Sequence, residues 1–388
     1  MRVRRCAVLF LEPREEVRFE WEQLLSGGDG LIRRRRWMAL APHLDREMEV
    51  DADARECLGV LGPSEWVRID EVPAPRSVID RLVEEGLLIC DAAEHAVMRE
   101  RDEVLRNTYW HPLAATLHAF TRWSGVDTVQ NMKDSGTETA AQMREVLGAP
   151  PIEAEVRSDE DGRLMLPRIA ANAFDDLLAR RVTCRNFDAN RKLPLELFAQ
   201  LLQRVFAAQA EVRVSDDTVF LKKNVPSGGG LHPMECYLMV QHVEGVVPGL
   251  YHYHAQHHAL EPMSGADKPL REFMMDMVAQ QHWFADAHVM VLLSPRFDRT
   301  FWKYRHHAKG YRVVALEAGH LSQTLYLAAT EAGLGAFITG AINEKELEQA
   351  FGLDPIHQGA LAICGFGWRG EVMETAELDP AGTVWTAA

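Results

Sequence analysis

The sequence has no apolar stretch that could cross a membrane. Its 388 residues contain no run of about eighteen apolar residues, which is the length that a transmembrane helix requires. Near the N-terminus the apolar run Ala7–Leu11 is short and is followed at once by Glu12, so it lacks the length of a secretory signal. We therefore expect a cytoplasmic protein without a membrane partner and without a processed targeting segment.

An excess of positive charge is also missing. The chain has 42 Lys and Arg residues against 57 Asp and Glu residues, which gives a formal net charge of -15. Proteins that bind nucleic acid without sequence preference present a basic surface to the phosphate backbone. The overall charge therefore argues against nucleic acid as a general partner, although a local basic patch stays open.

Closely spaced cysteines are absent. The six cysteines form no CxxC motif and are scattered along the chain: Cys6, Cys57, Cys90, Cys184, Cys236 and Cys364. This spacing is typical of reduced thiols in a cytosolic protein and gives neither a disulfide framework nor a zinc motif. Four histidines from His252 to His258 cluster in a predicted hairpin, but no carboxylate stands at a matching spacing. We expect surface histidines there and no metal site.

The chain has enough apolar residues for two domains. Hydrophobic residues make up 47% of it, and a chain of this length is expected to divide its core. We predict a small unit of short strands and helices over residues 1–100, a helical connector and linker over 101–165, and a larger domain over 166–388.

The connector is predicted to contain one helix and a long loop. Leu113, Leu117 and Phe120 recur at a helical period, which predicts a helix in this segment. Residues 129–165 are rich in charge, Gly and Pro, which is typical of an exposed loop.

A helix between two strands is predicted near residues 77–90. Ser77 has Asp80 three residues later, which is the spacing of a capping box, and Gly86 stands where a helix often ends in a left-handed residue. The segment resembles a winged helix, specifically the PqqD-like elements that hold leader peptides in peptide maturation enzymes. A unit used only for packing or dimer contacts is the alternative. The basic run Arg33–Arg36 could meet an acidic leader or simply be solvated.

Three consecutive glycines lie in the middle of the stretch Lys222–Tyr237, KKNVPSGGGLHPMECY. Glycine has no Cβ and accepts a positive φ, so Gly228–Gly230 can bring backbone groups close to a ligand. The following residues, Met234–Val243, are predicted to form a strand. A Walker or Rossmann loop leads into a helix instead, so a flat or anionic ligand of another class is expected. A hairpin loop with surplus glycine is the alternative.

Arginines and a hydroxyl are concentrated in an earlier segment of the larger domain. Arg180, Arg181, Thr183 and Arg185 lie within six residues, next to the end of a predicted helix. Guanidinium groups bind phosphate oxygens in a bidentate manner, so the segment is a candidate anion site. A salt-bridged surface turn is the alternative.

A long helix is predicted from about Tyr311 to Ala332. Its apolar residues give it a broad face, suited to a central position or to a subunit interface: Val313, Val314, Leu316, Leu321, Leu325 and Ala328. Glu317, His320 and Gln323 are three residues apart and can share one side.

Five motifs, in their order and spacing, resemble one family. RRVTCRNF, PSGGGLHPMECY, WKY, LEAGHLSQTLYLAATEAGLG and GFGWR are similar to those of the SagB/McbC-type dehydrogenases, the FMN-dependent azoline oxidases of peptide maturation. The resemblance covers about residues 170–372. It implies an α+β, nitroreductase-like FMN-binding fold, here preceded by the winged-helix-like domain. It also implies a homodimer with FMN at the interface.

The resemblance carries FMN-binding roles onto matching residues. Arg181, Thr183 and Arg185 match positions that hold the phosphate and ribityl chain, and the backbone of Pro226, Ser227, Gly228 and Gly229 matches the part that lies along the isoalloxazine ring. Gln323 and the Thr339–Gly340 turn match positions near the flavin, and Arg369 a position near the phosphate. The chain departs from the family where Thr183 replaces a usual Ser and where Thr324 replaces a frequent Asn.

The implied reaction is oxidation of a thiazoline or oxazoline in a peptide to the azole. Lys303 and Tyr304 match the catalytic pair of the family, to which we assign proton abstraction and relay. The implied partners are a peptide substrate and a cyclodehydratase or another protein of a maturation complex. Two alternatives stay open: a general NAD(P)H-dependent nitro or quinone reductase, and a scaffold that binds peptide without turnover.

Overall fold

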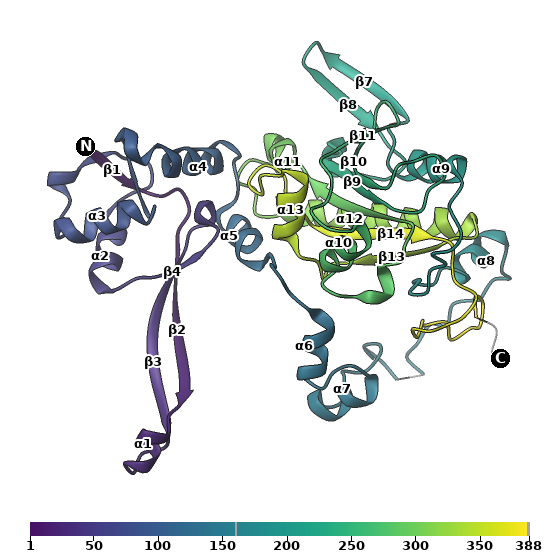
Figure 1. Cartoon of the computed structure of the whole chain (residues 1–388), viewed down its shortest axis with the longest axis horizontal. Helices are drawn as coiled ribbons and strands as arrows, with labels where there is room; N and C mark the ends of the chain where they lie inside the picture. The colour runs from purple at the N-terminus through teal and green to yellow at the C-terminus, as the bar shows by residue number, and fades with distance from the viewer. Residues whose placement is uncertain (160, 386–388) are drawn as a thin grey trace. The chain divides into compact units, whose positions relative to one another are not determined.

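The computed structural model describes residues 1–159 and 161–385. The chain folds as two compact units, which Figure 1 draws from purple at the N-terminus to yellow at the C-terminus. The first unit comprises Met1–Arg122, Arg296–Val314 and Asp354–Gly359, and the second comprises the remaining described residues. The predicted segments 1–100, 101–165 and 166–388 stay a prediction about the organisation of the chain.

The first unit has a small antiparallel sheet with its N-terminal strand in the middle. Its strand order is β5-β1-β6, and helices accompany it. The bounds are β1 (Arg2–Arg5), α2 (Ala52–Val60), β5 (Val67–Arg68), α3 (Arg76–Glu84), β6 (Leu88–Cys90), α4 (Ala96–Asn107) and α5 (Pro112–Thr121). Buried side chains such as Val3, Leu58, Leu82 and Ile89 form its core. These elements are compatible with the predicted winged-helix-like domain.

Helix α3 begins two residues earlier than the capping box predicted. Pro75 occupies the N-cap, no side chain caps the helix, and Arg76 instead pairs with Asp80 at 2.8 Å. The prediction of a Ser77 cap is therefore wrong. The end of the helix is as predicted: Gly86 has φ 79°, and its N–H donates to Val83 O at 3.1 Å. This is part of the Schellman pattern that left-handed glycine permits.

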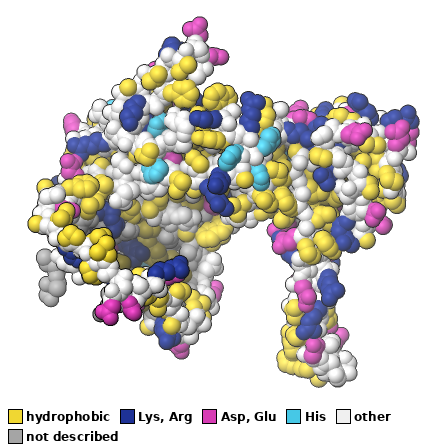
Figure 2. All heavy atoms as spheres, turned by 180° about the vertical axis from the view of Figure 1, so that it is seen from behind, with side chains coloured by type: hydrophobic (Ala, Val, Ile, Leu, Met, Phe, Trp, Pro, Cys, Tyr) yellow, Lys and Arg dark blue, Asp and Glu magenta, His cyan; other side chains and the backbone are white. Residues whose placement is uncertain are grey.

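A long hairpin extends from the first unit (Figure 1). Its elements are β2 (Phe10–Phe19), α1 (Trp21–Leu25), β3 (Leu31–Leu40) and β4 (Glu47–Glu49). Most of the predicted basic run pairs with carboxylates of the same arm: Arg33 with Glu15 and Asp29, Arg34 with Glu49, and Arg36 with Glu16 and Glu49. Figure 2 shows basic and acidic side chains next to one another along this arm.

Helix α5 forms in the segment where the spacing of Leu113, Leu117 and Phe120 predicted a helix. Leu113 and Leu117 are 62% and 53% exposed, whereas Ala115 and His118 are 3% and 5% exposed. The predicted helix is confirmed, and its buried face is formed by small residues and the histidine rather than by the two leucines.

The second unit is built around a six-stranded antiparallel sheet of order β11-β10-β9-β12-β14-β13. The strands are β9 (Met234–Val240), β10 (Gly249–His254), β11 (Ala259–Pro262), β12 (Val289–Pro295), β13 (Gly335–Thr339) and β14 (Ala362–Gly367). The helices are α8 (Ala173–Ala179), α9 (Leu195–Val205), α10 (Leu270–Met277) and α13 (Glu344–Phe351). Strands β9, β12 and β14 are buried along almost their whole length, as expected for the middle of a covered sheet.

Helix α12 (Gly310–Glu331) is the long helix that the sequence predicted. Gly333 follows it with φ 74°, which satisfies the left-handed position after a helix end. Val314, Leu321 and Leu325 are buried, but Leu316 is 62% exposed. Leu316 therefore does not belong to the buried face, and the exposed side of α12 carries an apolar residue.

The connector contains more helix than predicted. Residues 129–165 are exposed as expected, yet α6 (Thr128–Asp134) and α7 (Ala140–Leu147) form in this region. Asp127 caps α6, and Thr139 with Gln142 forms a capping box at the start of α7. These local hydrogen bonds satisfy the first N–H groups of each helix.

A second hairpin, β7 (Ala210–Ser215) with β8 (Thr218–Lys222), precedes the glycine stretch. The chain runs from the end of β8 directly into that stretch, which places the glycines between the hairpin and β9.

None of the described helices is both long enough and apolar enough to span a membrane.

Candidate functional site

The arginine segment of the second unit is extended and presents Arg181, Thr183 and Arg185 outward. Val182, Cys184 and Asn186 are at most 7% exposed, and Cys184 N–H donates to Ala336 O at 2.8 Å. Because side chains of an extended chain alternate, Arg181, Thr183 and Arg185 lie on the other face. The three residues predicted to bind phosphate and ribityl groups therefore share one accessible face.

Two of these residues meet at one aromatic side chain of α12. The guanidinium of Arg181 lies 5.3 Å from the ring centroid of Tyr326. The hydroxyls of Thr183 and Tyr326 are 3.0 Å apart. Burial raises the pKa of Tyr326, so its hydroxyl stays protonated at neutral pH. Arg181 and Thr183 thus offer a cation and a hydroxyl side by side.

Arg185 and Arg369 are both tied to the C-terminal segment. Arg185 donates from Nη1 to Ala376 O at 2.8 Å, and Arg369 pairs with Glu377. The Glu377 side chain is fully buried and also accepts from the N–H of Arg185 at 2.6 Å and from Trp385 Nε1 at 2.8 Å. Glu377 therefore fixes the segment that carries the arginine face, and Arg369 already has a carboxylate partner.

The glycines form a tight bend before β9. Gly228–Gly230 make a single 3₁₀ turn in which Gly229 has φ 67° and Gly230 has φ 70°. Left-handed backbone at two consecutive positions strongly favours glycine. A Cβ added at Gly230 would meet no atom within 4 Å, so the requirement is conformational there. The bend is followed by a strand, as the sequence predicted.

The side chain of Ser227 points into the protein and holds the bend in place. Its hydroxyl donates to the carboxyl of Glu317 on α12 and accepts the N–H of His232 at 2.9 Å. On the same helix, His320 Nδ1 donates to Pro226 O at 3.1 Å. Ser227 can therefore contribute its backbone to a ligand, while its hydroxyl is already engaged.

Glu317 is the residue of this region whose role sequence reasoning missed. It is 2% exposed, and burial raises the pKa of its carboxyl, an effect partly offset by the hydrogen bond from Ser227 and by the nearby Lys223. The spacing of Glu317, His320 and Gln323 put them on one side of α12, but it did not show that the first two contact the glycine bend.

The remaining predicted flavin contacts lie at two places in the second unit. Gln323 is exposed on α12, and Thr324 donates to His320 O within that helix at 2.8 Å. Thr339 is buried and receives a hydrogen bond from Gln281 at 3.0 Å. Gly340 is exposed, and a Cβ there would meet nothing within 4 Å.

Lys303 and Tyr304 belong to the first unit. Helix α11 (Phe297–Lys303) buries Phe297, Thr300 and Phe301 and ends at Tyr304. Lys303 is exposed, and its Nζ lies 5.6 Å from the ring centroid of Tyr304. The predicted catalytic pair is thus adjacent and accessible at the end of a helix.

The comparisons with known proteins match the larger domain. The model of the nitroreductase family matches residues 178–368. MJ1384 of Methanocaldococcus jannaschii, a protein named as a nitroreductase, is 31% identical over 186 residues, which are 48% of this chain and 87% of that protein. The chain belongs to the nitroreductase family. This is a family of oxidoreductases, and the α+β, nitroreductase-like fold class is confirmed.

Two further relatives of this nitroreductase-family chain are peptide-processing proteins by name. The trifolitoxin-processing protein TfxB of Rhizobium leguminosarum bv. trifolii is 32% identical over 178 residues, which are 44% of this chain and 46% of TfxB. The microcin B17-processing protein McbC of Escherichia coli is 26% identical over 191 residues, which are 47% of this chain and 65% of McbC. The chain thus spans less than two thirds of either relative. The resemblance to a SagB/McbC-type nitroreductase-superfamily protein is confirmed.

Among solved structures, the nitroreductase-family chain resembles one in the E. coli microcin synthetase McbBCD complex with truncated pro-MccB17 bound. The TM-score is 0.48 at 19% identity, and the match covers 69% of this chain and 94% of that chain.

The histidine hairpin of the nitroreductase-family domain has carboxylates that the sequence pattern did not reveal. His252 Nδ1 lies 2.6 Å from Glu261, and its Nε2 lies 3.3 Å from Glu235. These contacts raise the pKa of His252, the hydrogen bond with Glu235 most. Within residues 1–159 and 161–385, no group of three His, Cys, Asp or Glu side chains could hold a metal ion.

Proposed function

We propose that this protein is an FMN-dependent dehydrogenase that oxidises thiazoline or oxazoline rings in ribosomally made peptides to azoles. The observation that carries the proposal is the outward row of Arg181, Thr183 and Arg185 in a nitroreductase-family chain that also has the Pro226–Gly230 bend. The relatives TfxB and McbC, both processing proteins by name, support a peptide as substrate. Together they favour flavin chemistry on a peptide.

The residues of the second unit fit FMN. The guanidinium of Arg181 and the hydroxyl of Thr183 are suited to a phosphate and a polyol. The backbone of Gly228–Gly230 is partly to fully exposed. It has no Cβ and can lie against a flat ring, and open space surrounds Gly230 and Gly340. Gln323 and Arg369 complete the proposed set. When bound, the flavin would accept a hydride from the substrate ring.

Lys303 and Tyr304 are proposed to remove and relay the proton that leaves the other ring carbon. Conversion of an azoline to an azole removes two hydrogens, one as hydride and one as a proton, so a base is needed in addition to the electron acceptor. Both side chains lie at the end of α11, and Lys303 is exposed. Their adjacency supports a relay from one to the other.

We further propose a homodimer that works beside another maturation protein. The exposed side of α12 includes Leu316 and Gly319 as well as His320 and Gln323, and 62% exposure of Leu316 is consistent with a partner on this face. A second copy would bring ligands from both subunits to one flavin. A cyclodehydratase is the proposed further partner, because azoline rings must be formed before they are oxidised.

The test starts with the colour of the purified protein and ends with the mass of the peptide. A yellow preparation absorbing at about 450 nm is expected, and a co-expressed precursor peptide should lose about 2 Da per ring.

Lys303→Ala and Tyr304→Phe should abolish that loss of mass without removing the colour. Lys309→Ala, which removes an exposed lysine of the same loop, is the matched control and should react normally. A colourless protein contradicts flavin binding.

A general NAD(P)H-dependent nitro or quinone reductase is the second candidate. The 31% identity with MJ1384 favours it, because that relative is named as a nitroreductase. In this case Lys303→Ala would leave the reduction of a quinone unchanged and the peptide mass would not change. A peptide-binding scaffold would have neither activity.

A further inference from the structure

Residues that precede the nitroreductase-family domain anchor the helix that carries Lys303. Trp110, between α4 and α5, is 3% exposed. Its ring centroid lies 4.5 Å from that of Phe297 and 4.7 Å from that of Phe301. Because of the helix period, Lys303 lies on the opposite side of α11 from these two rings. The packing against Trp110 therefore determines the direction in which α11 presents Lys303.

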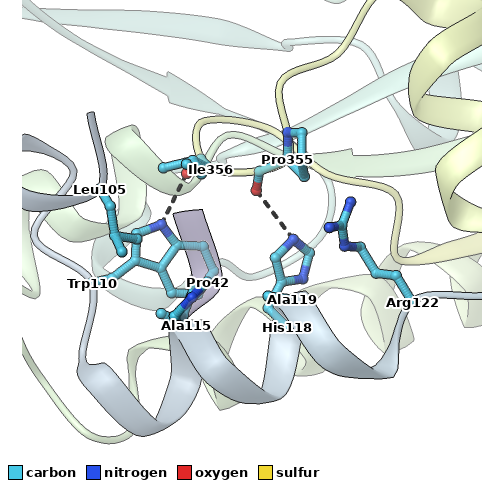
Figure 3. Close-up of a pocket in the computed structure, with 9 residues that line it drawn as sticks. All are labelled: Pro42, Leu105, Trp110, Ala115, His118, Ala119, Arg122, Pro355 and Ile356. Atoms are coloured by element: carbon cyan, nitrogen blue, oxygen red, sulfur yellow. Dashed lines mark hydrogen bonds between the residues drawn. The ribbon is translucent and has the colours of Figure 1, made fainter. Parts of the chain in front are cut away.

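Trp110 is itself held on two sides. Its Nε1 donates to Ile356 O at 2.9 Å, and its ring stacks on His118 at 5.4 Å between centroids. Figure 3 shows both side chains pointing from α5 and the residues before it toward the loop that contains Pro355 and Ile356. Such a combination of stacking and a directional hydrogen bond leaves the indole little freedom to rotate.

His118 links this anchor to the residue that follows the Lys303–Tyr304 loop. Burial lowers the pKa of His118 to about 3, so the ring is neutral. Pro355 O lies 3.1 Å from Nε2 and can only accept, so Nε2 carries the proton. Nδ1 then accepts from the hydroxyl of Tyr311 at 3.3 Å. Tyr311 stands at the start of α12, so both ends of the loop are fixed.

The loop also docks onto Tyr109 through strained backbone. His306 N–H donates to Tyr109 O at 2.9 Å, and His306 Nδ1 donates to Trp110 O at 3.1 Å. Tyr109 has φ 58° and His306 has φ 51°, a left-handed conformation that costs other residues than glycine about 1–2 kcal/mol. Strain of this kind persists only where the surroundings enforce it, and it clusters at functional sites. Arg305 adds a cation–π contact, 4.3 Å from the Tyr109 ring.

We propose that Tyr109, Trp110 and His118 are positioning residues for the reaction assigned to Lys303 and Tyr304. The N-terminal part of the chain is then required for turnover and is more than a docking module. This inference rests on the proposed function. Trp110 does not touch the reacting groups; it acts by holding α11. A displacement of about 1 Å at a reacting group can lower a rate about a hundredfold.

The experiment uses the full-length, FMN-loaded protein and a synthetic peptide with one thiazoline ring. Trp110→Ala is expected to lower kcat by about tenfold or more, while KM and the flavin content per chain stay within about twofold of the wild type. Trp110→Phe keeps an aromatic ring against Phe297 and Phe301 and should recover most of kcat. An unchanged kcat in Trp110→Ala would overturn the inference.

Two further variants separate positioning from a general loss of stability. Trp66 is a partly buried indole of the same unit, 4.4 Å from the guanidinium of Arg4, so Trp66→Ala should lower stability and leave kcat unchanged. Tyr109→Gly permits the positive φ but removes the ring under Arg305, so kcat should fall without a lower melting temperature. Equal losses of kcat in Trp66→Ala and Trp110→Ala would refute positioning. A wild-type protein without flavin or turnover would contradict the proposed function instead.

Discussion

At the scale of single residues, the carboxyl group of Glu317 beneath the glycine bend is the most informative. It is buried, yet it accepts the hydroxyl of Ser227 and lies near Lys223. Burial favours the neutral acid, whereas the hydrogen bond and the lysine favour the anion. Because burial is the largest influence, the pKa of Glu317 is raised from 4.5. The folded protein therefore binds a proton there more tightly than the unfolded chain.

This difference predicts a pH dependence of stability. A carboxyl whose folded pKa is raised contributes stability below its unfolded pKa of 4.5, and that contribution is lost as the pH rises through the folded pKa. Glu317→Gln should remove this loss, so the difference in melting temperature between variant and wild type should grow from pH 4.5 upward. A difference that stays constant across this pH range for Glu317→Gln would contradict the shift.

His118 gives a second prediction, with the opposite sign. Its pKa is lowered from 6.5 to about 3 by burial, so the unfolded chain takes up a proton in this range and the folded chain does not. The contribution of His118 to stability is thus full above pH 6.5 and is lost progressively as the pH falls toward 3. His118→Gln cannot take up that proton, so its melting temperature should fall less steeply over the same range. Parallel curves for wild type and variant would disprove this.

At the scale of elements, two helix ends with similar backbones allow a matched comparison. Gly86 after α3 has φ 79° and Gly333 after α12 has φ 74°. A Cβ at Gly86 would lie 2.8 Å from Leu44 Cδ2 and 3.1 Å from Met98 Sδ, whereas a Cβ at Gly333 would meet nothing within 4 Å. Both alanine variants adopt an unfavourable φ at a cost of about 1 kcal/mol, and only one adds a collision.

Gly86→Ala should therefore destabilise the protein by about 1–3 kcal/mol more than Gly333→Ala does. Urea unfolding followed by a probe in each unit measures both values. Equal losses would show that Leu44 and Met98 move aside without penalty.

Elements with a strong period or a glycine end were predictable from sequence, and their faces were less so. The long helix near residues 311–332, the strand at 234–243 and the left-handed Gly86 all follow from local patterns. In α5, the period of the apolar residues predicted the helix but not its buried face. That face includes His118, which packs against Phe297, a residue distant in the sequence. The short helices α6 and α7 were not predicted, because the charged residues and glycines of this segment favour a loop, although both helices have N-terminal caps.

In the candidate site, features set by adjacent residues could be predicted from the sequence, whereas contacts between distant residues could not. The clustering of Arg181, Thr183 and Arg185 and the bend at Gly228–Gly230 could be predicted, because each depends on a few adjacent residues. The contact of Glu317 with Ser227 joins residues 90 positions apart. The partner of Arg369 is Glu377, a residue of the C-terminal segment that no motif includes. Contacts of this kind depend on the fold and leave no signal in the sequence pattern.

At the scale of the whole molecule, we propose that this nitroreductase-family protein transfers a hydride from a peptide azoline to flavin, with Lys303 and Tyr304 moving the proton. The most direct measurement is a single turnover without oxygen, in which FMN-loaded protein is mixed with one equivalent of a thiazoline peptide. The claim predicts that the absorbance at about 450 nm is bleached while the peptide becomes about 2 Da lighter. A persistent yellow colour with an unchanged peptide mass would contradict it.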